Sequence, residues 1–202
     1  MKPSAIVLAG GMSRRLGRNK AVELVGGQPL LHRVLSRIAQ IASDTVVVLA
    51  SQSQAEDLSL PLGVITALDT YPGKGSLGGI YTGLSAVRTP WALVVSCDMP
   101  FLNIELLNEM WHRSTDFDAV VPVLDGRPEP THAFYSKACL PHIQGKLESG
   151  DLKIARFFDS VNVNFMPQSD VENLDPQRLS FFNVNTQEDL DRALDLVSRE
   201  QQ

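Results

Sequence analysis

The sequence predicts an α/β fold in three layers, in which a mostly parallel, partly mixed sheet lies between two layers of helices. Short apolar runs rich in β-branched residues alternate with segments of helical periodicity, which is typical of a parallel sheet covered on both faces. The second half of the chain has more consecutive strand patterns, so we expect a mixed sheet. No repeat or linker interrupts the 202 residues, which predicts a single domain over residues 1–202.

The expected elements can be placed in order along the chain. Pro29 opens the first helix, because proline is favoured at the first helical position and apolar residues recur after it at helical spacing. The last helix begins after Thr186, which is followed three residues later by Asp189 in a pattern that resembles a capping box. Strands are predicted at residues 5–9, 45–49, 64–68, 91–97, 119–123, 131–135, 161–166 and 181–184, and helices at 29–41, 80–87, 104–111, 138–147, 154–158 and after 186.

Composition and charge exclude several classes of partner. The net charge is −5 and no basic face that would neutralise phosphates is evident, so we expect no nucleic-acid partner. No apolar run approaches the roughly 20 residues of a membrane span, and the N-terminus lacks the layout of a signal peptide. We therefore expect a cytoplasmic protein with no membrane partner. The two cysteines predict no disulfide framework, and Cys97 is expected to pack as a small hydrophobe.

A glycine-rich, basic segment follows the first strand, from Leu8 to Lys20. Glycines directly after a strand let the backbone approach a ligand, and the exposed N–H groups of such a turn form a concavity for anions. The segment has neither the ending of an NTPase phosphate loop nor the glycine spacing of a dinucleotide fold. An ordinary flexible loop with solvated charges is the alternative. The positive charges that could neutralise a polyphosphate are Arg14, Arg15, Arg18 and Lys20.

Two aspartates stand directly after predicted strands, where ligands bind in open α/β sheets. The carboxylate of Asp98 is suited to Mg²⁺, which takes one or two carboxylates together with phosphate oxygens and water. Asp69 precedes a loop that contains four glycines. The alternatives are structural, with Asp98 capping the following helix and Asp69 serving as a turn residue. His132 lies within a strand pattern and is expected to be structural.

Four segments resemble one family of nucleotidyltransferases, the molybdenum cofactor guanylyltransferases. Residues 8–20 have the order leucine-alanine-glycine-glycine, then serine-x-arginine-x-glycine, then a lysine. The strand end around Asp98 is similar to the family, and so is the loop of residues 72–80, although Ser76-Leu77-Gly78-Gly79 replaces the commonest form, proline-leucine-alanine-glycine. Residues 182–190 resemble the C-terminal signature, in which Asn183 and Asn185 alternate with a valine.

The resemblance implies a Rossmann-like sandwich of the nucleotide-diphospho-sugar transferase type and a Mg²⁺-dependent reaction. GMP would pass from GTP to the terminal phosphate of molybdopterin with release of pyrophosphate, and other cofactor-synthesis proteins would make transient contacts. Asp98 would hold the metal, and Asn183 and Asn185 would share one side of a strand and lie toward the acceptor. The implied catalytic residues are Arg15, Lys20 and Asp98, and the implied nucleotide-binding residues are Leu8, Ala9, Gly10, Gly11, Lys20, Asp69, Gly78 and Asp98.

Two kinds of alternative function remain open at this point. A cytidylyltransferase for the same cofactor, or a sugar-1-phosphate nucleotidyltransferase, shares the opening loop and the metal aspartate. A non-catalytic GTP-binding adaptor would bind the nucleotide without releasing pyrophosphate. The Asp69 loop and the Asn-Val-Asn pattern favour the guanine enzyme, and the presence of both Asp98 and Lys20 favours an enzyme over an adaptor.

Overall fold

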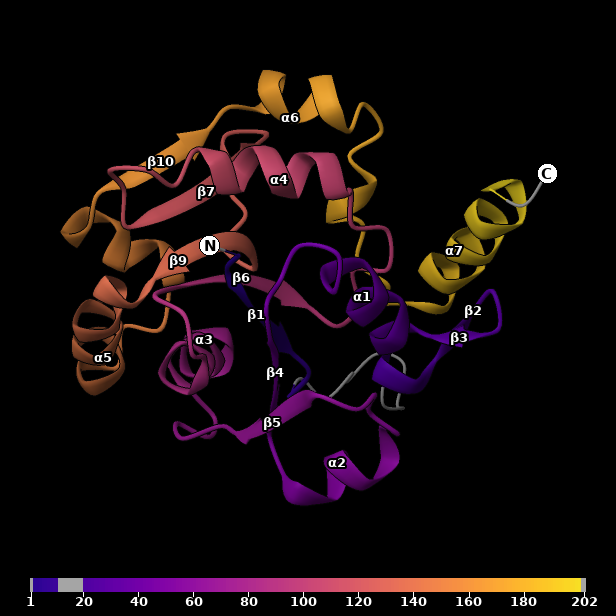
Figure 1. Cartoon of the computed structure of the whole chain (residues 1–202), viewed down its shortest axis with the longest axis horizontal. Helices are drawn as coiled ribbons and strands as arrows, with labels where there is room; N and C mark the ends of the chain where they lie inside the picture. The colour runs from indigo at the N-terminus through magenta and orange to yellow at the C-terminus, as the bar shows by residue number, and fades with distance from the viewer. Residues whose placement is uncertain (1, 11–19, 201–202) are drawn as a thin grey trace.

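The fold is built on one eight-stranded sheet between two layers of helices, in a computed structural model that describes residues 2–10 and 20–200 (Figure 1). The strands are β1 (Ser4–Leu8), β4 (Thr45–Leu49), β5 (Val64–Leu68), β6 (Trp91–Ser96), β7 (Ala119–Leu124), β8 (Arg127–Pro128), β9 (His132–Ser136) and β10 (Val163–Met166). They run in the order β10-β7-β9-β6-β1-β4-β5, and β8 pairs with β7. Strand β9 is antiparallel to both neighbours, whereas β5, β4, β1 and β6 form a parallel block. The expected mixed, mostly parallel sheet is confirmed.

Helices cover both faces of the sheet because strand residues alternate between them. In β1, Val7 belongs to the core on one face and Ile6 to the core on the other, and both are fully buried. The first face is covered by α1 (Leu30–Ile38), α2 (Gln52–Asp57), α4 (Ile104–His112) and α6 (Gln168–Leu174). The second is covered by α3 (Gly75–Ala86), α5 (Leu140–Ser149) and the 3-10 helix Ile154–Ser160. The three-layer prediction is confirmed.

A third, smaller apolar cluster attaches the C-terminal helix α7 (Gln187–Glu200) to a hairpin of β2 (Leu24–Val25) and β3 (Gln28–Pro29) (Figure 1). The predicted capping box at the start of α7 is confirmed: Asp189 N donates to Thr186 Oγ1 (3.1 Å), and Thr186 N donates to Asp189 Oδ2 (2.8 Å). The buried members of the cluster are Val25, Leu30, Phe101, Val184, Leu190, Ala193 and Val197.

The predicted strand at residues 181–184 is wrong. Asp175 accepts hydrogen bonds from Leu179 N (3.1 Å) and Ser180 N (2.8 Å), which turn the chain into the 3-10 helix Leu179–Phe181. The residues that follow then pass the end of β6, where Val184 N donates to Asp98 O (2.9 Å). Asn183 and Asn185 therefore do not share one side of a strand.

Other differences have similar local reasons. Helix α3 begins at Gly75 and not at residue 80, so half of the expected glycine loop is helical. Helices α2 and α6 were not predicted, because α2 buries no side chain and α6 buries only Val171, which leaves no apolar periodicity. The hairpin of β2 and β3 is too short to give a strand pattern.

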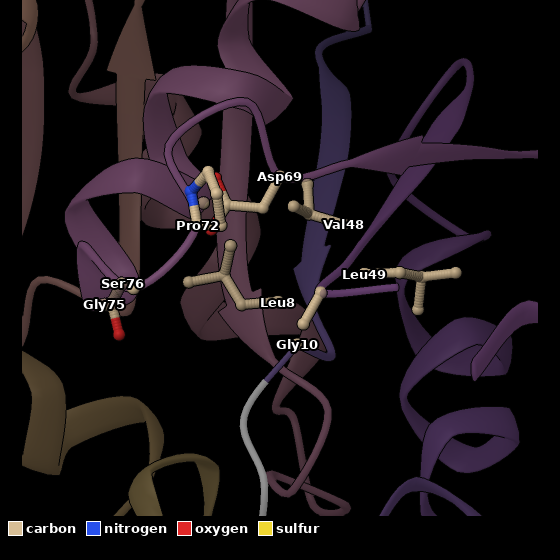
Figure 2. Close-up of a pocket in the computed structure, with 11 residues that line it drawn as sticks. Leu8, Gly10, Val48, Leu49, Asp69, Pro72, Gly75 and Ser76 are labelled. Carbon is tan, nitrogen blue, oxygen red and sulfur yellow. The ribbon is translucent and has the colours of Figure 1, made fainter. Parts of the chain in front are cut away.

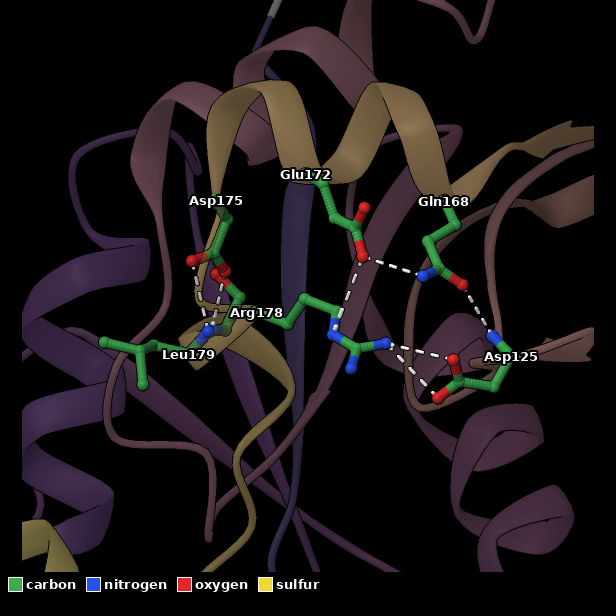
Figure 3. Close-up of polar contacts among 7 residues, drawn as sticks. Asp125, Gln168, Glu172, Asp175, Arg178 and Leu179 are labelled. Atoms are coloured by element: carbon green, nitrogen blue, oxygen red, sulfur yellow. Dashed lines mark hydrogen bonds and ion pairs between the residues drawn. The ribbon is translucent and has the colours of Figure 1, made fainter.

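A polar network joins the turn after β7 to α6 (Figure 3). Arg178 Nη1 donates to both carboxylate oxygens of Asp125 (3.2 Å each). Gln168 accepts from Asp125 N (2.8 Å) and donates to Glu172 Oε1 (2.7 Å). Both Arg178 and Asp125 have positive φ, 53° and 49°, which is uncommon for residues with a side chain. The network connects to the segment that leads to residues 181–185.

Within the described residues, no helix has the length and apolar character needed to cross a membrane.

Candidate active site

A cavity of about 500 Å³ opens at the carboxyl ends of β1, β4 and β5 (Figure 2). The strand ends contribute Leu8, Gly10 and Leu49 to its lining, and the loop after β5 contributes Asp69. The start of α3 adds Ser76, and the N–H groups in the first turn of a helix have no partner within the helix. The cavity lies where open α/β sheets bind ligands and offers backbone donors at one wall.

Two glycines let the walls of the cavity approach one another. A Cβ atom on Gly10 would stand 3.1 Å from Ala50 N, and one on Gly79 would stand 3.0 Å from Leu8 Cδ2. At Gly10 the neighbour is backbone, which cannot move aside without shifting the end of β4. Glycine at position 10 therefore lets the ends of β1 and β4 approach each other closely at the cavity.

Asp69 is fixed at the cavity by the loop that it begins. Its Oδ1 accepts hydrogen bonds from Tyr71 N (2.9 Å) and Thr82 Oγ1 (3.2 Å). Its Oδ2 accepts none from another residue that the structure describes. Gly78 lies against this loop, because a Cβ atom there would stand 2.9 Å from Tyr71 O and 3.2 Å from Asp69 Oδ1. Gly78 is not among the described lining residues, so it supports the position of Asp69 from behind.

A second polar group lies at the end of β6 and is called here the lysine cluster: Lys20, Asp98 and Asn185. Lys20 Nζ donates to Asp98 Oδ2 (3.2 Å) and to Asn185 Oδ1. The sequence separations from Lys20 are 78 and 165 residues, so only the tertiary structure brings the three together. The side chains of Lys20 and Asp98 are 15% and 12% exposed, and their charges are therefore poorly screened by salt.

Asp98 has a free acceptor in this cluster. Its Oδ1 is buried and has no hydrogen-bond partner among residues 2–10 and 20–200. A buried carboxylate oxygen without a partner is costly, and a cation would satisfy it. The same residues contain no group of three or more His, Cys, Asp or Glu side chains that could hold a metal. One carboxylate fits Mg²⁺, which completes its shell with phosphates and water, better than a metal held by protein ligands alone.

Leu8 connects the cavity with the lysine cluster. Its side chain lines the cavity, and its carbonyl oxygen accepts a hydrogen bond from Cys97 N (3.1 Å), the residue before Asp98. Ala9 continues β1 with only 3% exposure, and its N–H donates to Val48 O (2.9 Å). The two features therefore lie at neighbouring strand ends, so that one extended ligand can reach both.

The structure places the predicted site residues in different surroundings. Leu8, Gly10 and Asp69 line the cavity, and the members of the lysine cluster lie together. Asn183 does not join that cluster, because its Nδ2 donates to Phe181 O (3.1 Å). Gly11 and Arg15 lie outside the described residues. The sequence analysis missed three lining residues, although they stand at the carboxyl end of a predicted parallel strand, where ligands bind: Val48, Leu49 and Ala50.

Two buried titratable side chains at this end of the sheet are structural, as expected. Burial lowers the pKa of His132 to about 3, and the centroid of its ring lies 4.3 Å from that of the Phe181 ring. Burial, helped by the charge of Asp98, raises the pKa of the Cys97 thiol to about 12. A buried histidine with so low a pKa is a poor base, and a protonated thiol is a poor nucleophile near neutral pH.

The class of protein is defined by the fold. A solved structure of 2-C-methyl-D-erythritol 4-phosphate cytidylyltransferase from Thermus thermophilus has a TM-score of 0.72 to this chain, with 98% of this chain and 100% of that chain covered. At 19% sequence identity this likeness shows the fold, which is that of the nucleotide-diphospho-sugar transferase type of nucleotidyltransferase.

Within that class the family is shown by sequence. The model of the MobA-like NTP transferase domain matches residues 5–164, and the chain belongs to this family. It is 32% identical over 192 residues to the molybdenum cofactor guanylyltransferase of Desulfosudis oleivorans, with 94% of this chain and 93% of the relative covered. It is 31% identical to molybdopterin-guanine dinucleotide biosynthesis protein A from Archaeoglobus fulgidus, whose crystal structure has a TM-score of 0.84 and covers 97% of this chain and 99% of that chain.

Proposed function

We propose that this chain transfers GMP from GTP to the terminal phosphate of molybdopterin, releasing pyrophosphate and forming the guanine dinucleotide form of the cofactor. One observation carries the proposal. A chain that matches a molybdenum cofactor guanylyltransferase over 94% of its length has a cavity at its strand ends joined through Leu8 to a lysine–aspartate pair. A pocket next to a shielded cation and a carboxylate is what a nucleoside triphosphate requires.

The guanosine part of GTP occupies the cavity in this proposal, with Asp69 as its polar contact. Oδ1 of Asp69 already accepts two hydrogen bonds, so Oδ2 is the oxygen that remains for the ligand. It can accept one N–H of the guanine edge or one ribose hydroxyl, but the carboxylate cannot pair with guanine through both oxygens in its present position. The backbone of residues 8–11 would line the nucleotide, as the resemblance implies, and Gly78 would act by holding the Asp69 loop.

The lysine cluster handles the negative charge. Lys20 would bind the triphosphate and the departing pyrophosphate together with Arg15, and the free Oδ1 of Asp98 would hold Mg²⁺. When bound, Mg²⁺ neutralises phosphate charge and draws electron density from the reacting phosphorus. Asn185 Oδ1 fixes the direction of the Lys20 ammonium group, so that Lys20 is placed before the nucleotide arrives.

No protein nucleophile or general base is needed. The acceptor oxygen of molybdopterin belongs to a phosphate and is already an anion, so it can attack the α-phosphorus of GTP directly. The Pα–O bond to the pyrophosphate then breaks and its electrons leave with pyrophosphate. Catalysis comes from alignment and charge neutralisation, as in phosphoryl transfer generally. The acceptor-side role that the resemblance implies for Asn185 stays a prediction. The reaction takes place in the cytoplasm, where transient contacts with other cofactor-synthesis proteins deliver the acceptor and collect the product.

The test is pyrophosphate release by the purified protein with molybdopterin, Mg²⁺ and one nucleotide at a time. GTP is expected to be used in preference to CTP and ATP, and binding of each is measured in parallel by calorimetry with and without Mg²⁺. Inosine triphosphate, which lacks the guanine amino group, and 2′-deoxy-GTP separate base from ribose contacts of Asp69. Preference for CTP moves the chain to the cytidylyltransferases. GTP binding without pyrophosphate release identifies an adaptor and refutes the proposed activity.

A further inference from the structure

Asn185 owes its position to the cap of α7. Asn185 N donates to Asp189 Oδ2 (2.9 Å), and Thr186 N donates to the same oxygen (2.8 Å). Asp189 N donates in return to Thr186 Oγ1 (3.1 Å). An ordinary capping box joins only the N-cap residue and the third residue of the helix. Here the carboxylate also holds the residue before the cap, and that residue is the one whose side chain accepts a hydrogen bond from Lys20.

The backbone on either side of Asn185 is fixed as well. Val184 N donates to Asp98 O (2.9 Å), and the Val184 side chain is fully buried in the apolar cluster that also contains the buried residues of α7. The segment is therefore held by Asp98 at one end and by α7 at the other, which Figure 1 shows beside the β2–β3 hairpin. Because the backbone is held at both Val184 and Thr186, we expect a change in the cap to shift the side-chain amide of Asn185.

The surroundings of Asp189 keep its carboxylate charged. Burial alone would raise the pKa of Asp189, but hydrogen bonds from Asn185 and Thr186, together with the charge of Lys20, lower it below its usual value. The cap and the lysine cluster are joined by Asn185, which donates from its backbone to Asp189 and accepts with its side chain from Lys20. Asp189 is thus connected to Lys20 through the hydrogen bonds of Asn185.

We propose that Asp189 is a positioning residue that acts through Asn185: it sets where Asn185 Oδ1 meets Lys20 Nζ and thereby orients the ammonium group. The consequence for catalysis rests on the proposed function, whereas the chain of contacts from Asp189 through Asn185 to Lys20 does not. A cap that served only the stability of α7 would leave Lys20 unchanged when it is lost.

The first test measures acylation of Lys20 by an amine-reactive N-hydroxysuccinimide ester in the ligand-free protein. Mass spectrometry compares the rate with that of Lys153, which is exposed. Asp189→Asn is expected to raise the relative rate at Lys20 roughly threefold, because the ester reacts with the unprotonated amine, and the loss of a charge-assisted hydrogen bond makes that form more accessible. Asn185→Ala should raise it at least as much, and the double variant should show no further increase.

The control for this test is Asp191→Asn, which makes the same charge change on α7. Asp191 Oδ1 accepts from Gln187 Nε2 (2.9 Å) on the exposed side of the helix, so Lys20 labelling should not change. Asp189→Glu, the kind of acid more usual in a capping box, should return labelling toward the wild-type rate. Equal labelling of Lys20 in wild type and Asp189→Asn would overturn the proposal, whatever the activity of either protein.

The second test is a double-mutant cycle on pyrophosphate release and thermal stability. Asp189→Asn is expected to lower kcat about tenfold with the KM for GTP within twofold, because misplaced catalytic groups slow the chemical step. In an Asn185→Ala background the kinetic loss should vanish, while the fall in Tm persists. Val197→Ala, which loosens α7 away from the cap, should lower Tm and leave kcat nearly unchanged. Equal kinetic losses from Asp189→Asn in the wild-type and Asn185→Ala backgrounds contradict the proposal. If the labelling results are as expected but the wild-type protein releases no pyrophosphate, only the proposed function is refuted.

Discussion

The cavity and the lysine cluster lie at the same edge of the sheet but are built in different ways. The described part of the cavity lining comes from residues 8–79 and consists mainly of backbone, glycines and apolar side chains, with Asp69 as its charged member. The lysine cluster has only side chains of polar and charged residues, which come from three distant segments. The difference teaches that the cavity is formed by consecutive β–α units, whereas the lysine cluster depends on how remote segments meet.

The largest effect is expected from the lysine cluster. Asp98→Ala should lower kcat by roughly 10²- to 10³-fold at saturating Mg²⁺, because the reaction loses its carboxylate at the phosphates. The far-ultraviolet circular dichroism spectrum should remain that of the wild type, since Asp98 stands at the end of β6 and not within it. Asp191→Ala, on the exposed side of α7, is the control: it also removes one carboxylate, and kcat should stay at the wild-type value. Near-wild-type turnover of Asp98→Ala would remove the metal site from this cluster.

Lys20→Ala tests whether the same cluster contributes to binding. The dissociation constant for GTP, measured by calorimetry, should rise about tenfold, which corresponds to the loss of one charge-assisted contact. Lys2→Ala removes the same charge at the opposite end of β1, where Lys2 Nζ donates to Gln40 O (3.0 Å), and should leave the affinity unchanged. An unchanged dissociation constant for Lys20→Ala would assign nucleotide binding to the cavity alone.

A smaller effect is expected at the cavity, where a pair of adjacent glycines gives a matched comparison. In Gly78→Ala the new methyl group meets the backbone of Tyr71 at 2.9 Å, so the Asp69 loop must shift and GTP should bind roughly threefold more weakly. In Gly79→Ala it meets the end of the Leu8 side chain at 3.0 Å, which also lines the cavity but can turn aside without moving the Asp69 loop. Calorimetric titration of both variants with GTP checks the order. Equal affinities would show that the position of the Asp69 loop does not matter.

The smallest effect is expected outside both regions. Gly145 lies on the exposed side of α5, and a Cβ atom there would meet nothing within 4 Å. Gly145→Ala should therefore stabilise the protein by about 0.5–1 kcal/mol, because alanine loses less backbone entropy in a helix. Denaturant unfolding measures the gain, and kcat and GTP affinity should match the wild type. A loss of stability would mean that α5 is not packed as the structure shows.

The sequence determined the layered architecture and the local half of the site. Continuous apolar runs indicate buried strands such as Thr45–Leu49. Gly10 of the glycine-rich segment and Asp69 after the third strand both line the cavity. The capping box at Thr186 could also be predicted, because all of its hydrogen bonds connect residues at most four positions apart. Elements with little burial, such as α2, left no apolar pattern and could not be predicted.

Only the tertiary structure decided how Lys20, Asp98 and Asn185 meet. The sequence predicted a strand at residues 181–184, in which Asn183 and Asn185 would point to the same side. In the structure, hydrogen bonds from Leu179 N and Ser180 N to Asp175 bend the chain. Only Asn185 then contacts Lys20, whereas Asn183 donates to Phe181 O. The physical reason is that hydrophobic periodicity reports burial along one element, while a hydrogen bond across 165 residues depends on where two elements are packed. Sequence alone predicted the residue types that the chemistry requires; packing of α7 against the β2–β3 hairpin placed them together.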